Sequence, residues 1–89
     1  MQPTEPPRIE FPCRYPIKVM GEARDDFADF VVATVSRHAP GLLYEEVSIR
    51  PSRDGNYLAV TLFIEAQGEA QLALIFGALK GDPRVRMVL

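Results

Sequence analysis

The sequence is poor in the side chains that build disulfides and metal sites. Its 89 residues include one cysteine (Cys13), one histidine (His38) and no tryptophan. A single cysteine excludes a disulfide within the chain, which is typical of proteins from a reducing compartment. A zinc site needs three or four protein ligands, and one Cys with one His makes such a site hard to build. We therefore expect no metal and no cofactor.

Long apolar runs and an excess of positive charge are also missing. No apolar stretch approaches the ~20 residues of a membrane span, and the first seven residues lack the basic start and apolar segment of a signal peptide. These features predict a cytoplasmic protein without a membrane partner. Ten basic residues stand against 12 acidic ones, for a net charge of −2. Nucleic-acid binders usually have a basic excess, so nucleic acid is disfavoured as a partner. A balanced total charge is still compatible with a local basic patch.

What is present is the composition of one globular domain preceded by a proline-rich segment. The apolar fraction of 47% and the charged fraction of 25% are ordinary for a folded protein, and 89 residues suffice for one core. Five of the eight prolines fall within the first 16 residues. Because proline lacks an amide donor and favours extended neighbours, we predict a flexible arm over 1–12 and a single domain over 13–89.

Hydrophobic periodicity predicts six elements in that domain. Alternation over 14–20 indicates a half-buried strand that Gly21 ends, and the period changes after Asp25 to that of a helix, which Pro40 and Gly41 stop. The helical stripe consists of Phe27, Phe30, Val31, Thr34, Val35 and His38.

The second half of the chain is predicted to form a β-hairpin, then a helix and then a last strand. A strand over 44–51, with Val47 and Ile49 inward, leads through a Gly-containing turn into a strand over 57–66. A helix is predicted over 69–80, followed by a last strand over 84–89 with its arginines outward and with Val85 and Met87 inward. The order β-α-β-β-α-β predicts an α+β, ferredoxin-like sandwich, in which both helices cover one face of a four-stranded antiparallel sheet of order 4-1-3-2.

Four stretches also carry a family resemblance. They are Tyr-Pro-Ile-Lys-Val-Met-Gly at 15–21, Arg-His-Ala-Pro-Gly at 37–41, Gly-Asn-Tyr at 55–57 and Val-Arg-Met-Val-Leu at 85–89. In this order they resemble the YbeD-like family of small bacterial proteins of unknown function. The resemblance implies a ferredoxin-like fold similar to ACT-type regulatory domains, and it brings no catalytic residues with it. The proline-rich arm and Cys13 depart from the family pattern.

The sheet face opposite the helices is the predicted place of function. We expect it to bind a protein partner or a small acidic ligand, with the arginines supplying charge-assisted hydrogen bonds. The alternative is an ordinary solvated face. The residues predicted for this surface and the adjoining loop are Lys18, Met20, Gly21, Ala59, Thr61, Phe63, Arg84, Arg86 and Val88.

Two functional modules share this topology, and neither fits the sequence well. An RNA-recognition motif stacks bases on aromatics at alternate positions of the third strand, and here Ala59 and Thr61 leave the middle of that platform bare. An acylphosphatase needs an anion cradle after the first strand, and the loop 21–26 holds one glycine and three acids.

The remaining reactive side chains, His38 and Cys13, are better explained without a catalytic role. His38 at a helix C-terminus is typical of an interaction with the helix dipole rather than of a general base. Cys13 is a lone thiol beside the arm. We therefore predict a non-enzymatic regulatory or binding protein that senses a small metabolite or modulates a metabolic enzyme. The alternatives are a protein-interaction adaptor without a ligand, or an RNA-binding module. Self-association through the open face or the edge of the last strand is predicted as well.

Overall fold

The computed structural model describes residues 10–89, and it confirms the predicted order of elements. Residues 1–9 of the predicted arm lie outside the described residues. Phe11, which the sequence assigned to the arm, is half-buried against the core. The elements are β1 (Cys13–Glu22), α1 (Phe27–His38), the 3-10 turn η1 (Tyr44–Glu46), β2 (Ser48–Pro51), β3 (Tyr57–Ala66), α2 (Glu69–Lys80) and β4 (Val85–Val88).

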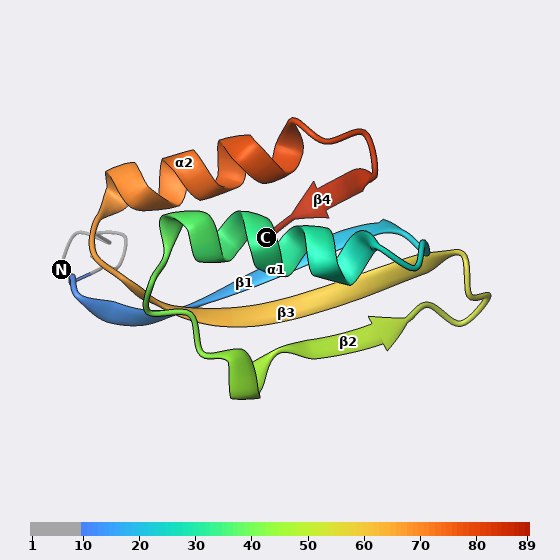
Figure 1. Cartoon of the computed structure of the whole chain (residues 1–89), viewed down its shortest axis with the longest axis horizontal. Helices are drawn as coiled ribbons and strands as arrows, with labels where there is room; N and C mark the ends of the chain where they lie inside the picture. Colours follow the sequence, from blue (N-terminus) through green and yellow to red (C-terminus); the bar gives the residue numbers. More distant parts are fainter. Residues whose placement is uncertain (1–9) are drawn as a thin grey trace, which may run out of the picture.

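The four strands form one antiparallel sheet in the order β2-β3-β1-β4, which is the predicted order read from the other edge. Both helices lie on the same face of this sheet (Figure 1). The two central strands pair along their full length, from Cys13 opposite Ala66 to Glu22 opposite Tyr57. The edge strands β2 and β4 have four residues each. The fold is therefore the expected α+β sandwich with one sheet face left open.

The core lies between the sheet and the helices, and the predicted periodicities build it. Every second residue of β1 and β3 points to the helices, and each helix contributes one apolar stripe in return. Each fully buried Val, Leu, Ile or Phe side chain contributes roughly 1.5–3 kcal/mol. The largest fully buried side chains are Phe27, Ile17, Leu62, Ile64, Ile75, Leu79, Val19, Val31, Val35 and Val60.

The strand predicted over 44–51 is shorter in the structure. Its first part forms η1, in which the Glu46 amide donates to the Leu43 carbonyl and the Val47 amide to the Tyr44 carbonyl. Ile49 pairs with buried Val60 and so points to the helix side, yet it is 51% exposed. The reason is its position on an edge strand, outside the cover of the helices.

A register shift in the last strand corrects the predicted facing of its side chains. Met87 pairs with Met20 and Val88 with Val19, but Val85 pairs with Gly21, so β4 carries one extra residue. Such a bulge breaks strict alternation. Val88 consequently faces the core together with Val85, and Met87 takes the open face. The prediction that Val88 lies on the open face and Met87 points inward is wrong for this reason.

Candidate functional site

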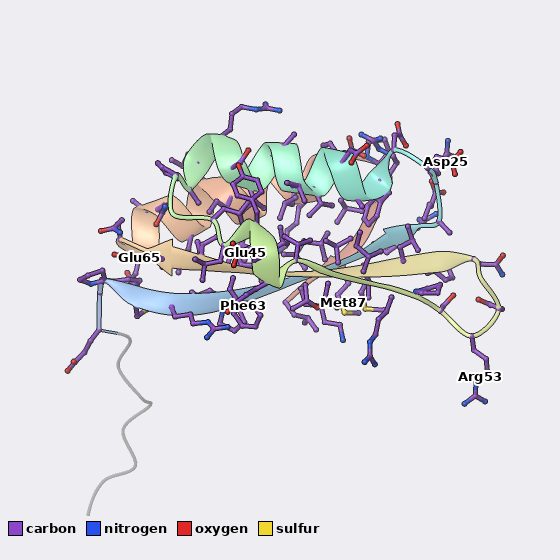
Figure 2. All side chains as sticks on the ribbon, turned by 60° about the horizontal axis from the view of Figure 1, so that its bottom comes forward. Asp25, Glu45, Arg53, Phe63, Glu65 and Met87 are labelled. Atoms are coloured by element: carbon purple, nitrogen blue, oxygen red, sulfur yellow. The ribbon has the colours of Figure 1, made fainter. Side chains whose placement is uncertain are left out.

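The open sheet face brings together most of the side chains predicted for it. Lys18 pairs with Thr61, and Thr61 pairs on its other side with Ser48, so these three residues form one row across β1, β3 and β2. The next row on this face joins Met20, Ala59 and Arg50 in the same way, and Met87 continues it onto β4. Figure 2 shows Phe63 and Met87 on the side of the sheet that faces away from the helices.

These two rows enclose a hollow of about 300 Å³ lined by Lys18, Ser48, Arg50, Ala59 and Thr61. Its floor is shallow because β3 contributes only the small side chains of Ala59 and Thr61. Its walls are high because the flanking strands β1 and β2 contribute the long cationic side chains of Lys18 and Arg50. Neither Lys18 nor Arg50 forms an ion pair with any carboxylate of residues 10–89. We call this group of five residues the face hollow.

Next to the face hollow lies an apolar strip, defined here as Met20, Met87 and Leu89. Leu89 extends β4, since its amide donates to the Lys18 carbonyl at 2.8 Å and its carbonyl accepts from the Lys18 amide at 3.1 Å. Met87 is 49% exposed and Leu89 is 62% exposed. Antiparallel pairing therefore leaves a band of large apolar side chains uncovered at the β4 edge.

Phe63 stands apart from that strip under a charged neighbour. The Arg14 guanidinium lies 4.3 Å from the centroid of the Phe63 ring and forms an ion pair with Glu46. A cation over a ring face is attracted by the ring quadrupole. The surface on which a base would stack is thus occupied, which argues against the RNA-recognition alternative.

Arg84 is placed differently from the prediction. Its guanidinium lies 4.3 Å from the centroid of the Phe30 ring on α1, away from the open face. It donates to Asp82 from Nε at 2.9 Å and from Nη2 at 3.0 Å, and to Asp26 from Nη1 at 2.8 Å. The side-chain hydrogen bonds from Arg84 and, to a lesser extent, the bond from its backbone amide at 2.9 Å hold the pKa of Asp82 below its ordinary value of 3.8. The side-chain bonds also raise the pKa of Arg84.

The same corner of the molecule holds two more ion pairs around Glu22. Arg24 contacts it at 3.0 Å and Arg86 at 3.1 Å, so the predicted open-face residue Arg86 has an acidic partner. A hollow of about 420 Å³ lies here, lined by Glu22, Arg24, Asp26, Asp82, Pro83 and Arg84. Its cations are already matched by carboxylates of the same chain. The sequence does not reveal this cluster because Asp26 and Arg84 are 58 residues apart.

Gly21, predicted as part of a ligand loop, serves close packing instead. A Cβ atom at this position would lie 2.4 Å from the Arg84 carbonyl oxygen and 2.4 Å from the Phe27 ring. Protein atoms already fill the space that a missing side chain would leave for a ligand. The requirement for glycine at position 21 is therefore explained by the contact between β1, α1 and the segment before β4.

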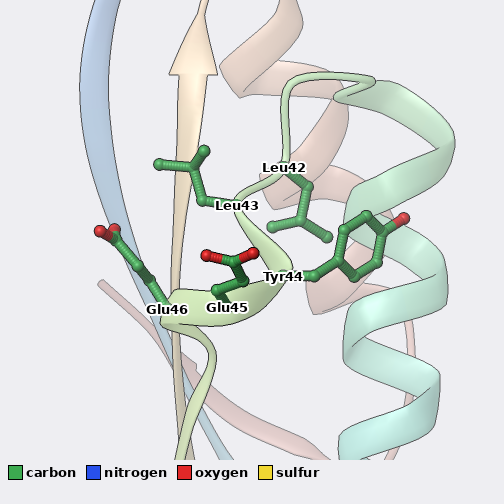
Figure 3. Close-up of a pocket in the computed structure, with 5 residues that line it drawn as sticks. All are labelled: Leu42, Leu43, Tyr44, Glu45 and Glu46. Atoms are coloured by element: carbon green, nitrogen blue, oxygen red, sulfur yellow. The ribbon is translucent and has the colours of Figure 1, made fainter.

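A third hollow, of about 350 Å³, lies beside η1 and is lined by Leu42, Leu43, Tyr44, Glu45 and Glu46 (Figure 3). Tyr44 is 61% exposed and Leu43 is 41% exposed. All five lining residues are consecutive in the chain. This hollow carries two acids, of which Glu46 is already engaged by Arg14.

The remaining candidate residues, His38 and Cys13, do not lie in a cluster with other reactive side chains of residues 10–89. The His38 carbonyl accepts a hydrogen bond from Gln71 Nε2 at 2.9 Å, which ties the end of α1 to α2. Cys13 is half-buried against the core. In the part of the chain that the structure describes, no three His, Cys, Asp or Glu side chains are grouped to hold a metal ion. Neither helix of residues 10–89 has the length and apolar character needed to cross a membrane.

Solved structures show the same fold. The solution structure of Protein HP0495 from H. pylori covers 99% of this chain and 98% of its own, with a TM-score of 0.73 and 17% identity. The ACT domain from GTP pyrophosphokinase of Chlorobium tepidum covers 86% of this chain and 83% of its own, with a TM-score of 0.68 and 13% identity. Both identities are low, so these likenesses establish the fold alone.

Sequence relatives establish the family. A UPF0250 protein of Azotobacter vinelandii is 50% identical over 84 residues, covering 93% of this chain and 91% of its own length. A UPF0250 protein of Ectopseudomonas mendocina is 48% identical over 86 residues, covering 96% and 94%. The family model described as "Protein of unknown function (DUF493)" matches residues 6–89. This chain therefore belongs to the DUF493 family, in agreement with the resemblance to small bacterial proteins of unknown function seen in its sequence.

Proposed function

We propose that this protein is a non-enzymatic regulatory module that senses a small metabolite on its open sheet face. The observation that carries the proposal is the face hollow, which Lys18 and Arg50 line from opposite sides without a carboxylate partner among residues 10–89. In the corner around Glu22, by contrast, the cations that line a hollow are engaged by carboxylates. A volume of about 300 Å³ is at the lower end of what small-ligand sites occupy.

The fold supports the same role by analogy. ACT-type domains are ligand-sensing regulatory domains, and the ACT domain of the Chlorobium tepidum enzyme shares this architecture. Fold does not determine function, so this role is inferred from the open surface rather than from the likeness. The loop at Gly21, the other place predicted for a ligand, is packed with protein atoms and internally paired charges.

A thermal-shift screen tests this function. The panel should contain amino acids, carboxylic acids, phosphate esters, amines and neutral metabolites at equal ionic strength. A ligand present at ten times its Kd adds about 1.4 kcal/mol of stability, which raises the Tm of a domain of this size by about 6–11 °C. We expect at least one class to do so.

Two matched variants locate the binding. Ala59→Gln places a longer side chain on the floor of the face hollow, and it should abolish the shift. Ala73→Gln makes the same change on the exposed surface of α2 and should preserve it. A panel in which no compound stabilises the protein contradicts the proposed function, and equal shifts in both variants contradict the proposed surface.

A second candidate function is an adaptor that acts as a homodimer, and the apolar strip favours it. Met87 and Leu89 are exposed beside β4, whose outer edge pairs with no strand of residues 10–89, and exposed edges pair readily with another chain. The occupant proposed is a second copy of this chain. Sedimentation equilibrium at high micromolar concentration should then show a dimer.

The control for the dimer uses the opposite face. Met87→Glu should yield a monomer, whereas Leu74→Glu, at a position on α2 that is 61% exposed, should leave the dimer intact. A wild-type monomer at several hundred micromolar, or equal behaviour of the two variants, contradicts this second function.

A further inference from the structure

Two cationic side chains flank the face hollow. Its two cations come from strands on either side of β3, with Lys18 on β1 and Arg50 on β2. With neighbouring strands about 4.8 Å apart and a two-residue offset, their Cα atoms are roughly 12 Å apart. Side chains of this length can close over a group placed above Ala59 and Thr61, one from each side.

The chemistry of the lining is that of a carboxylate or phosphate site. Arg presents a planar fork of donors that matches both groups, and Lys adds a compact charge. Ser48 and Thr61 line the same hollow with hydroxyl groups, which donate hydrogen bonds to oxyanions. The lining thus supplies donors on three adjacent strands and contains no carboxylate.

The surrounding charges confine the attraction for anions to the face hollow. The chain as a whole carries a net charge of −2, so a general attraction for anions is not expected from its total charge. Two acids at the ends of the open face are engaged, Glu22 with Arg24 and Arg86, and Glu46 with Arg14. Glu65 lies at the far end of β3 opposite Arg14, four residues along the strand from Thr61, and accepts a hydrogen bond from Gln67. Lys18 and Arg50 therefore form a local positive site on a mildly acidic protein.

From these observations we infer that the face hollow, formed by Lys18, Ser48, Arg50, Ala59 and Thr61, binds the carboxylate or phosphate group of a small metabolite. The inference deepens the proposed function, on which it rests, by naming the chemical class of the ligand. It also assigns separate parts to the two cations, with Arg50 as the bidentate donor and Lys18 as the opposing charge.

The test uses the full chain and two probes, inorganic phosphate and succinate, titrated at constant ionic strength with sodium chloride. Amide chemical shifts report the binding. We expect saturable shifts centred on Lys18, Thr61 and Arg50 with either probe or with both, and the probe that binds more tightly identifies the preferred group. Chloride alone should produce no saturable change.

Charge-neutralising variants separate a site from general attraction. Lys18→Met and Arg50→Met should each raise the Kd for the bound probe about tenfold, in keeping with the loss of a charge-assisted hydrogen bond. Arg53→Met removes the same charge from the neighbouring β2–β3 turn, outside the hollow, and should change the Kd less than twofold. Lys18→Gln and Arg50→Gln serve as second variants if the methionine variants fail to fold.

Two results overturn the inference. One is the absence of saturable shifts at the hollow with both probes up to tens of millimolar. The other is a loss of affinity in Arg53→Met equal to that in Arg50→Met. If the thermal-shift screen nevertheless finds an amine or neutral ligand whose effect Ala59→Gln removes, the oxyanion inference fails while the proposed function stands.

Discussion

Gly21 of β1 and Phe27 of α1 are packed so closely that a Cβ atom on Gly21 would lie 2.4 Å from two carbons of the Phe27 ring. Phe27 is completely buried at the start of α1, so its ring cannot move aside into solvent without uncovering the core. The Arg84 carbonyl oxygen closes the other side at 2.4 Å. One small residue thus sets the distance between the sheet, the first helix and the segment before β4.

We predict that Gly21→Ala lowers the free energy of unfolding by about 3 kcal/mol, at the upper end of the cost of overpacking, because both neighbours are rigid. Urea denaturation measures it. Gly77→Ala is the matched control, since a Cβ at this exposed helical position meets nothing within 4 Å. It should raise the free energy of unfolding by about 0.5–1 kcal/mol. Equal effects of the two substitutions would contradict the packing described for Gly21.

The β2–β3 turn requires a left-handed residue at Gly55, which has a φ of +78°. An alanine there should cost about 1–2 kcal/mol, because Cβ approaches the following carbonyl oxygen in this conformation. Gly55→Asn should cost less, since asparagine tolerates the left-handed region. Beyond the adjacent residues, a Cβ atom on Gly55 would meet nothing within 4 Å, so the difference reports backbone conformation alone. Thermal unfolding of both variants checks the order.

The pKa of Asp82 predicts a pH dependence of stability. A carboxyl group whose pKa is lowered by folding binds protons more tightly in the unfolded chain. Its contribution to stability is therefore complete above the ordinary value of 3.8 and is lost as the pH falls through the lower, folded value. Arg84→Met should remove the largest part of this contribution and leave the bond from the backbone amide of residue 84, so the stability of the variant should fall less steeply below pH 4 than that of the wild type.

Carboxyl chemical shifts provide an internal control for that prediction. The pKa of Asp54 is also lowered, chiefly by a hydrogen bond from the Ser52 hydroxyl and by one from the Asn56 amide. In Arg84→Met the pKa of Asp82 should return toward 3.8, while that of Asp54 should stay low. A variant in which both groups move would show that the substitution disturbs the whole domain rather than one ion pair.

The bulge in β4 makes a further prediction about two neighbouring positions. Val88 faces the core opposite buried Val19, so Val88→Glu should lower the free energy of unfolding by about 1–3 kcal/mol. Met87 faces solvent, so Met87→Glu should change it by less than about 0.5 kcal/mol. Denaturant unfolding at a concentration where the protein is monomeric measures both. If Met87→Glu proved more destabilising than Val88→Glu, the result would instead support simple alternation, with Met87 facing the core and Val88 facing solvent.

Much of the architecture could be predicted from local pattern. The limits of β3 and α2 agree with the predicted ranges 57–66 and 69–80, because uninterrupted periodicity and flanking turn residues mark both ends. The strand order followed from the element order and the handedness of crossovers. The open face was predicted as well, since alternation in β1 and β3 places Lys18 and Thr61 opposite the core without any knowledge of the neighbours.

Tertiary structure decided what depends on register and on distant partners. The bulge opposite Met20 and Gly21 reverses the facing of Met87 and Val88, and nothing local in the final strand signals it. Arg84 turns to Phe30 and Asp26 because folding brings α1 beside it. Local periodicity thus determines which face of an element is apolar. Only the packed molecule determines which charges find partners, and among residues 10–89 it leaves Lys18 and Arg50 on either side of β3 without an ion pair.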